Sequence, residues 1–325
     1  MPSPVFRAAP VRVRVPATSA NLGPGFDAFG LALGLYDEVM VRIADAGLRI
    51  DVAGEGADEV ARDERHLVVR AMRAAFDRLG GQPPGLEVVC ANRIPHGRGL
   101  GSSAAAICAG ITAARALAVS PVPFTDDDVL QLATGLEGHP DNVAACLYGG
   151  FTIAWMDHPS EIDDRGVDLS TAAVLRLDPS QAVKVVAFVP TKPLSTEVAR
   201  GLLPRTVPHA DAARNAGRAA LLSAAVTQGR IDLLLAATQD RLHQPYRAPA
   251  MAESAALIAA LRAEGHAAVV SGAGPTVLVL TGEAQLEDVI ACGATAMGPE
   301  WRALGLAVDA AGAVSLDPAE GVMGE

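Results

Sequence analysis

A glycine-rich segment at residues 95–106 has the residue types and spacing of a phosphate-binding loop. Every second residue from 97 to 101 is glycine, so the backbone can approach a ligand without Cβ atoms in the way. Ser102 and Ser103 follow where the N-cap of a helix is expected, and the next three residues are alanines. A helix N-terminus has unpaired N–H donors and about half a positive charge, which suits phosphate. The segment therefore predicts a loop that binds phosphate through its backbone.

The residues alone leave two other interpretations of this segment open. It could be a glycine-rich turn before an ordinary serine-capped helix. It could also be a dinucleotide-binding fingerprint, although its G-x-G-x-G spacing differs from G-x-G-x-x-G and it does not follow the first strand. A Walker A loop is excluded, because that loop needs a lysine after its glycines and the only lysines, Lys184 and Lys192, lie elsewhere.

Two further clusters gather hydroxyl, amide and carboxylate groups. Residues 16–27 read Pro-Ala-Thr-Ser-Ala-Asn-Leu-Gly-Pro-Gly-Phe-Asp and follow a predicted strand, and residues 137–142 read Glu-Gly-His-Pro-Asp-Asn. Each cluster can be a polar ligand loop, or a capped turn whose side chains bond to their own backbone. If Glu137 and Asp141 bind a metal ion, carboxylate and serine ligands favour magnesium over zinc.

The elements that must position these clusters mix strands and helices in both halves of the chain. The residue patterns predict strands at 11–15, 39–43, 48–52, 86–91, 151–156 and 183–189, and two strands flanking 272–275. They predict helices at 66–79, 103–119, 125–137, 209–227, 231–241 and 251–264, then a terminal helix and strand. A turn with Asp45 and Gly47 joins the second and third strands. The irregular alternation favours an α+β fold, and the polar segment 157–180 is the best candidate for a domain junction.

Composition excludes several classes of protein. The chain has 325 residues, enough for two domains, and its net charge of −11 argues against binding nucleic acid or anionic membranes through the overall field. The four cysteines are widely spaced, which indicates buried thiols in a reducing compartment rather than a disulfide framework or zinc site. The N-terminus has no apolar run of a signal peptide, and no apolar stretch is long enough to span a membrane. We therefore expect a cytoplasmic protein with no nucleic-acid or membrane partner.

Taken together, these segments resemble the GHMP small-molecule kinases. Residues 95–105 are similar to that superfamily's ATP-phosphate loop, and residues 271–276 to its C-terminal glycine motif. Residues 16–27 resemble, almost residue for residue, the N-terminal signature of the branch that phosphorylates L-homoserine. Three shorter segments are also similar to that branch: 137–142, 195–200 and 245–247. The resemblance follows the family order and covers most of the chain.

The resemblance implies a fold and a reaction. It implies an N-terminal domain, residues 1–165, of the ribosomal-S5-domain-2-like type that carries the ATP-phosphate loop. It implies a ferredoxin-like C-terminal domain, residues 166–325, that completes the substrate site. The implied activity is ATP-dependent phosphorylation of the L-homoserine hydroxyl group to O-phospho-L-homoserine, in threonine biosynthesis, with Mg²⁺ as cofactor. ATP and L-homoserine would lie in the cleft between the domains, and the resemblance suggests a homodimer.

The resemblance also assigns roles to residues of this chain. Ser103 and Glu137 would bind magnesium. Asp27 suits an ammonium group, and Arg200 and Arg247 suit an α-carboxylate, because a guanidinium group can grip it through two parallel hydrogen bonds. The substrate would be bound by Asn21, Asp27, His139, Arg200 and Arg247. The triphosphate would be bound by Pro95, His96, Gly97, Arg98, Gly99, Leu100, Gly101, Ser102, Ser103, Ala104 and Ala105.

The catalytic position differs from that of some relatives. Asn142 stands where mevalonate kinases have a catalytic aspartate, and an amide cannot accept the hydroxyl proton as a carboxylate would. Because a loose phosphoryl-transfer transition state needs little activation of the nucleophile, our hypothesis is that Asn142 only positions the hydroxyl group. The proton would pass late to a phosphate oxygen or water. The alternatives are another GHMP kinase, a dinucleotide-dependent oxidoreductase, and an inactive ligand-binding relative.

Overall fold

The computed structural model describes residues 4–120, 123–157 and 170–316. Within these residues the strands form a larger sheet, a smaller sheet and a short two-stranded pair. The strands are β1 Val5–Phe6, β2 Val11–Asn21, β3 Gly25–Ala44, β4 Gly47–Gly54, β5 Gly85–Asn92, β6 Ala118–Val119, β7 Phe151–Asp157, β8 Thr171–Leu177, β9 Val183–Pro190, β10 Ala267–Val270, β11 Val277–Gly282, β12 Trp301–Leu306 and β13 Val314–Leu316. The helices are α1 Leu67–Arg78, α2 Ser102–Leu117, α3 Asp126–Glu137, α4 Asp141–Tyr148, α5 Thr196–Gly201, α6 His209–Gln228, α7 Ile231–Ala237, α8 Gln244–Arg247, α9 Ala252–Ala263 and α10 Leu286–Ala296, with 3-10 turns at Ala248–Ala250 and Glu283–Gln285.

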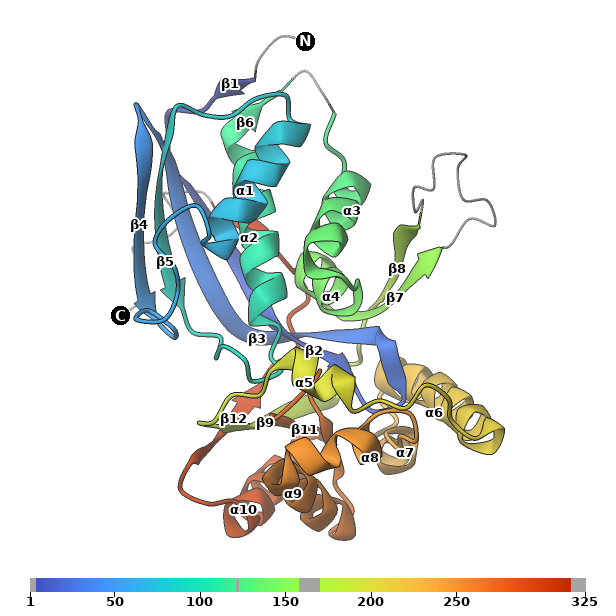
Figure 1. The fold of residues 1–325 in the computed structure, drawn as a ribbon. Coiled ribbons are helices and arrows are strands. Elements are labelled where there is room, and N and C mark those ends of the chain that lie inside the picture. Colours follow the sequence, from blue (N-terminus) through green and yellow to red (C-terminus); the bar gives the residue numbers. More distant parts are fainter. Residues whose placement is uncertain (1–3, 121–122, 158–169, 317–325) are drawn as a thin grey trace.

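The larger sheet is built around the long strand β3. Its strand order is β13-β2-β3-β5-β4, and β7 joins β3 to β8. The N-terminal part of β3 pairs with β7, and the C-terminal part pairs with β5. The turn predicted between β3 and β4 is present, but β4 runs parallel to β5 instead of pairing with β3. This topology leaves the tip of the β2–β3 hairpin extending toward the smaller sheet (Figure 1).

Helices α1–α4 lie on one face of the larger sheet (Figure 1). Helix α2 packs on β2 and β3, and α1 packs against α2. Small residues allow this close approach, since a Cβ atom at Gly110 would overlap the carbonyl oxygen of Val68. Met72 and Phe76 of α1 are fully buried in the same core. This packing therefore fixes the position of the N-terminus of α2, next to the β2–β3 hairpin.

The smaller sheet has the order β10-β11-β9-β12, with all neighbours antiparallel. Helices separate β9 from β10, and α10 separates β11 from β12, which gives the β-α-β-β-α-β connectivity of ferredoxin-like folds. Residues of β9 alternate between two clusters. Val185 and Ala187 join the main core, whereas Val186 and Phe188 pack with residues of α9 and α10. The predicted α+β fold and its ferredoxin-like part are confirmed.

Both halves of the sequence contribute to the larger sheet. Strands β8 and β13 lie beyond residue 165, yet they pair with β7 and β2. Within the predicted junction 157–180, residues 158–169 lie outside the described residues and 171–177 form β8. One buried cluster includes Leu31 of the larger sheet and Leu278 of the smaller one. The two sheets therefore share a hydrophobic core.

Residues 16–21 are not the loop that the sequence predicts. They continue β2, which pairs with β3 through two register shifts, one after Pro16 and one after Ala20. Thr18 and Ser19 are fully buried in this stretch. Across the described part of the chain, no helix is long and apolar enough to cross a bilayer. The polar signature thus lies inside the molecule, on a strand that ends at the gap between the sheets.

Candidate active site

A cavity of about 310 Å³ lies where the hairpin tip, the start of α2 and the helices of the smaller sheet meet. Ten of the residues that the sequence analysis assigned to ATP, substrate or metal line it, together with Asn142 of the predicted catalytic position: Asn21, Gly97, Gly99, Gly101, Ser102, Ser103, Glu137, His139, Arg200 and Arg247. Asp141, Thr196, Gly272 and Ala273 complete the lining. Residues from six separate segments of the sequence are thus brought to one place.

The glycine-rich loop leads directly into α2. Gly101 is the N-cap residue, with φ of +71°, and no side chain caps the helix. The predicted serine cap is therefore wrong, since Ser102 and Ser103 are the first residues of the helix. The uncapped N–H groups at the start of α2 and the partial positive charge of the helix remain available to an anion in the cavity.

Hydrogen bonds from neighbouring residues hold this loop on two sides. On the β2 side, the N–H group of Thr18 donates to the carbonyl oxygen of Leu100 at 3.0 Å. On the side of the smaller sheet, the hydroxyl group of Ser271 donates to the carbonyl oxygen of Gly99 at 2.6 Å. The N–H group of Thr276 donates to the carbonyl oxygen of Arg98 at 3.2 Å. The loop is therefore clamped between the two sheets.

The remaining loop residues lie outside the cavity lining. The side chains of Leu100, Ala104 and Ala105 are buried in the core. The guanidinium group of Arg98 donates to the carbonyl oxygens of His96 and Thr191, so it points toward the smaller sheet. A phosphate contact through Arg98 would require both bonds to break. Pro95 lines a separate groove with Arg98.

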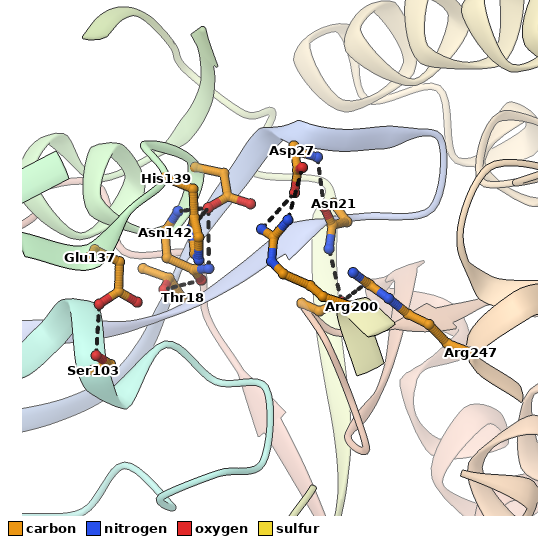
Figure 2. Close-up of polar contacts among 11 residues, drawn as sticks. Thr18, Asn21, Asp27, Ser103, Glu137, His139, Asn142, Arg200 and Arg247 are labelled. Atoms are coloured by element: carbon orange, nitrogen blue, oxygen red, sulfur yellow. Dashed lines mark hydrogen bonds and ion pairs between the residues drawn. The ribbon is translucent and has the colours of Figure 1, made fainter. Parts of the chain in front are cut away.

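Ser103 and Glu137 form an oxygen-rich pair on one wall (Figure 2). The hydroxyl group of Ser103 donates to Oε2 of Glu137 at 2.7 Å. Burial raises the pKa of the Glu137 carboxyl group, against the lowering effect of its hydrogen bond from Ser103. A hydroxyl and a carboxylate oxygen fit Mg²⁺, which takes few protein ligands and completes its shell with water and phosphate oxygens.

Asp27 and Arg200 face each other across the hairpin tip (Figure 2). Two hydrogen bonds join them, from Nη1 to Oδ2 at 3.2 Å and from Nη2 to Oδ1 at 3.0 Å. Asn21 fixes this corner, since its Oδ1 accepts from the N–H group of Asp27 at 2.9 Å and its Nδ2 donates to the carbonyl oxygen of Gly272 at 2.8 Å. Asn21 and Asp27 both adopt positive φ, which these residue types tolerate better than most.

Among the described residues, Arg247 has the largest fully buried side chain, with 1% of its surface exposed. Its Nη1 donates to the carbonyl oxygen of Gly272 and to Nδ1 of His243, both at 3.2 Å. Because Nδ1 of His243 accepts, Nε2 carries the proton and donates to the carbonyl oxygen of Gly23 at 2.8 Å. Burial lowers the pKa of both Arg247 and His243. A buried guanidinium group with only neutral hydrogen-bond partners favours an anion in the cavity.

A histidine, an aspartate and an asparagine meet at the start of α4. Nδ1 of His139 lies 2.7 Å from Oδ1 of Asp141, and this bond raises the pKa of His139. The N–H group of Asn142 donates to the same oxygen at 2.7 Å. Oδ1 of Asn142 accepts from the hydroxyl group of Thr18 at 2.8 Å. His139 therefore retains its proton to higher pH than a free histidine and acts as a hydrogen-bond donor.

Comparison with known proteins identifies the family. Residues 66–150 match the family model "GHMP kinases N terminal domain", and residues 212–298 match "GHMP kinases C terminal". The chain is 62% identical to a homoserine kinase of Streptomyces avermitilis, over 96% of this chain and 98% of the relative. It is 61% identical to the enzyme of Streptomyces coelicolor, over 97% of each. The chain belongs to the homoserine kinases, a branch of the GHMP kinases.

Solved structures agree with this family and its fold. A homoserine kinase from Cytophaga hutchinsonii has a TM-score of 0.80 and 25% identity, over 96% of this chain and 99% of that one. An L. major mevalonate kinase, at 18% identity and TM-score 0.66 over 95% of this chain and 98% of that one, shares the fold. Membership of the homoserine kinases leaves no support for the dinucleotide-binding interpretation of the glycine loop.

The candidate site has a neighbouring cavity that the sequence analysis did not predict. A second cavity of about 310 Å³ lies beside the first, and Ser102 and Ser103 line both. Its other walls are largely apolar and include Val39, Leu67 and Val68, together with polar residues Asn92 and His96. Val39, Leu67 and Val68 belong to ordinary strand and helix patterns, so no sequence signal marks them as ligand contacts. Thr18 was missed because its hydroxyl group contacts a residue far along the chain, Asn142. Asp141 was considered only as a metal ligand, and its hydrogen bonds to His139 and Asn142 were not predicted.

Proposed function

We propose that this chain transfers the γ-phosphoryl group of ATP to the side-chain hydroxyl group of L-homoserine, giving O-phospho-L-homoserine. One observation carries the proposal: two cavities meet at the uncapped start of α2, and one of them is lined by side chains suited to an amino acid. The identity to homoserine kinases supports the choice of substrate.

The start of α2 would receive the phosphates of ATP. The chain has only two lysines, and neither lines the two cavities. Of the arginines that do, Arg200 and Arg247 would bind the substrate and Arg65 is paired with Asp63, so backbone N–H groups and the helix dipole would supply most of the positive potential for the phosphates. The second cavity, with its apolar walls, has the size and position for the adenine base. Ser103 and Glu137 would hold Mg²⁺, which when bound neutralises the charge of the phosphates.

The polar cavity would receive L-homoserine as a zwitterion. Its ammonium group would bind Asp27, and its carboxylate group would bind Arg200 and the buried Arg247. Asn21 holds Asp27 in place, and His139 can donate a hydrogen bond from the opposite wall. These contacts would hold the ammonium and carboxylate groups on the α-carbon. The side-chain hydroxyl group would then be directed toward the loop at Gly101 and the phosphates.

The transfer needs orientation more than a strong base. The hydrogen bond to Asp141 raises the pKa of His139, and Asn142 is an amide, so we assign the hydroxyl proton to neither residue. In this mechanism the hydroxyl oxygen forms a bond to the γ-phosphorus while the bond to the β–γ bridging oxygen breaks, and ADP leaves with that electron pair. The proton passes late to an oxygen of the transferred group, as a loose transition state allows. Most of the rate enhancement would come from positioning and charge stabilisation.

Magnesium-dependent ADP release tests the proposed function. The wild-type protein would be assayed with L-homoserine, L-threonine, D-homoserine, mevalonate and galactose, each with and without chelation of the metal. We expect the fastest release with L-homoserine, and almost none when Mg²⁺ is removed. Absence of turnover with L-homoserine, or faster turnover with another alcohol, would contradict the proposal and would favour an inactive relative or a different kinase.

A further inference from the structure

We propose that Thr18 is a positioning residue for the phosphoryl transfer: its hydroxyl group orients the Asn142 amide so that Nδ2 faces the reacting oxygen. The inference rests on the proposed function and deepens it. Thr18 lies in the signature at residues 16–27, where the resemblance gave roles only to Asn21 and Asp27. Its side chain is fully buried, on a stretch of β2 that the sequence predicts to be a loop.

Thr18 makes hydrogen bonds both to the proposed substrate side and to the proposed ATP side of the site. Its hydroxyl group donates to Oδ1 of Asn142 at 2.8 Å, on the side of the acceptor substrate. Its backbone N–H group donates to the carbonyl oxygen of Leu100 at 3.0 Å, on the side of the phosphate loop. Figure 2 shows the bond to Asn142. One residue of a paired strand therefore fixes both the amide that faces the cavity and the loop that would hold the phosphates.

The hydroxyl group of Thr18 has little freedom to choose another partner. Gly101 lies directly against it, since a Cβ atom at Gly101 would overlap Oγ1 of Thr18 and would lie 3.2 Å from Oδ1 of Asn142. The space between β2, α2 and α4 is thus filled at this point. The bond to Asn142 is therefore set by backbone elements whose positions the shared core determines.

This bond decides which end of the Asn142 amide can act on substrate. Oδ1 accepts from Thr18, while within the described residues the only protein acceptor bonded to Nδ2 is Oδ1 of Asp141, at 3.4 Å. Nδ2 is therefore the part of the side chain left for the cavity, and it is a donor. An N–H group that donates to a lone pair of the substrate hydroxyl oxygen would hold that oxygen in line with the γ-phosphorus. The hydroxyl proton is then directed away from Asn142, toward a phosphoryl oxygen.

Kinetics of Thr18 variants test the inference. Thr18→Val keeps the shape and the β-branch and removes the donor, whereas Thr18→Ser keeps the donor. We expect Thr18→Val to lower kcat by about tenfold to a hundredfold, with the KM for ATP and for L-homoserine within about twofold of wild type. Thr18→Ser should retain kcat within about threefold, because the hydroxyl group is restored. Thr281→Val, at a buried threonine of the smaller sheet, should leave kcat unchanged.

A double-mutant cycle separates positioning from a structural role. In an Asn142→Ala background, Thr18→Val should lower kcat no further, because the group that it orients is gone. If the two losses of kcat multiply, or if Thr18→Val acts mainly on KM, Thr18 does not act through Asn142 and the inference is wrong. A kcat of Thr18→Val equal to that of the wild type would also overturn the inference. Failure of the wild-type protein to phosphorylate L-homoserine would instead contradict the proposed function, so the two failures are distinguishable.

Discussion

At the scale of single residues, the cavity proposed for the substrate holds two kinds of charge. One is an exposed ion pair, and the other is a buried arginine with no carboxylate partner among the described residues. Asp27 and Arg200 are more than a third exposed, so their ion pair is worth only about 0–1 kcal/mol and opens at low cost. Among the described residues, Arg247 makes no ion pair and donates only to neutral acceptors. A zwitterion can therefore replace the Asp27–Arg200 pair and neutralise Arg247, whereas an uncharged alcohol can do neither.

Arg200→Gln tests this arrangement. The KM for L-homoserine should rise roughly tenfold to a hundredfold, because a charged hydrogen bond is worth about 1.5–3 kcal/mol. The KM for ATP should stay within about twofold, since the side chain of Arg200 bonds to Asp27 and not to the glycine loop. Arg205→Gln, at an exposed arginine on the same segment, is the matched control and should leave both constants unchanged. A rise confined to the KM for ATP would place Arg200 at the phosphates.

At the scale of elements, the glycine loop depends on both sheets for its shape. Its carbonyl groups at residues 98–100 accept hydrogen bonds from Thr18 in β2 and from Ser271 and Thr276, which flank the turn between β10 and β11. The start of α2 therefore stays open to an anion while the loop before it is held by three neighbouring groups. A pre-formed loop avoids part of the ordering cost of binding ATP.

Gly99→Ala tests how strictly the loop is held. Gly99 has φ of +74°, and a Cβ atom there would overlap the carbonyl oxygen of Ser271. We expect the free energy of unfolding in urea to fall by about 2 kcal/mol or more, and the KM for ATP to rise. Gly135→Ala in α3 is the control, since nothing lies within 4 Å of a Cβ atom there. That change should raise stability by about 0.5–1 kcal/mol without affecting activity. Equal effects of the two variants would contradict the clamp.

The sequence predicts elements well where a pattern repeats and poorly where partners are distant. The helix at 66–79 appears almost as predicted, as α1, because its apolar spacing and the following glycines are local signals. Helices α5 and α8 span six and four residues, too few to show a period, yet they carry Arg200 and Arg247. The extension of β2 through Thr18 was missed because its buried hydroxyl groups are satisfied by residues far along the chain. The roles of these two arginines were predicted from the resemblance to GHMP kinases and not from residue periodicity.

At the scale of the whole molecule, two sheets share one core. Residues of β2, β3 and α2 belong to the same buried cluster as residues of β9, β11 and α6. Strands β8 and β13 also return to the larger sheet after residue 165. The substrate cavity lies between the sheets, so its geometry depends on both. We therefore expect the two sheets to unfold together as one cooperative unit.

The two tryptophans allow a direct test of this cooperativity, because Trp155 lies in β7 of the larger sheet and Trp301 in β12 of the smaller one. Trp301→Phe leaves Trp155 as the reporter, and Trp155→Phe leaves Trp301. Each variant would be unfolded in urea and followed both by fluorescence and by helical circular dichroism. In each variant, the fluorescence midpoint should equal the circular dichroism midpoint. A fluorescence midpoint that lies below the circular dichroism midpoint in one variant and above it in the other would show that the sheets unfold independently.

The pairing of β13 with β2 also determines when, during synthesis of the chain, the larger sheet can be completed. Val314 pairs with Arg14, 300 residues earlier in the chain. A ribosome therefore produces β2 long before the strand that covers its outer edge. Until then the growing chain presents an unpaired strand edge, the kind of surface through which unfinished chains associate. The larger sheet, although it begins at the N-terminal end, becomes complete only after the smaller one has been synthesised.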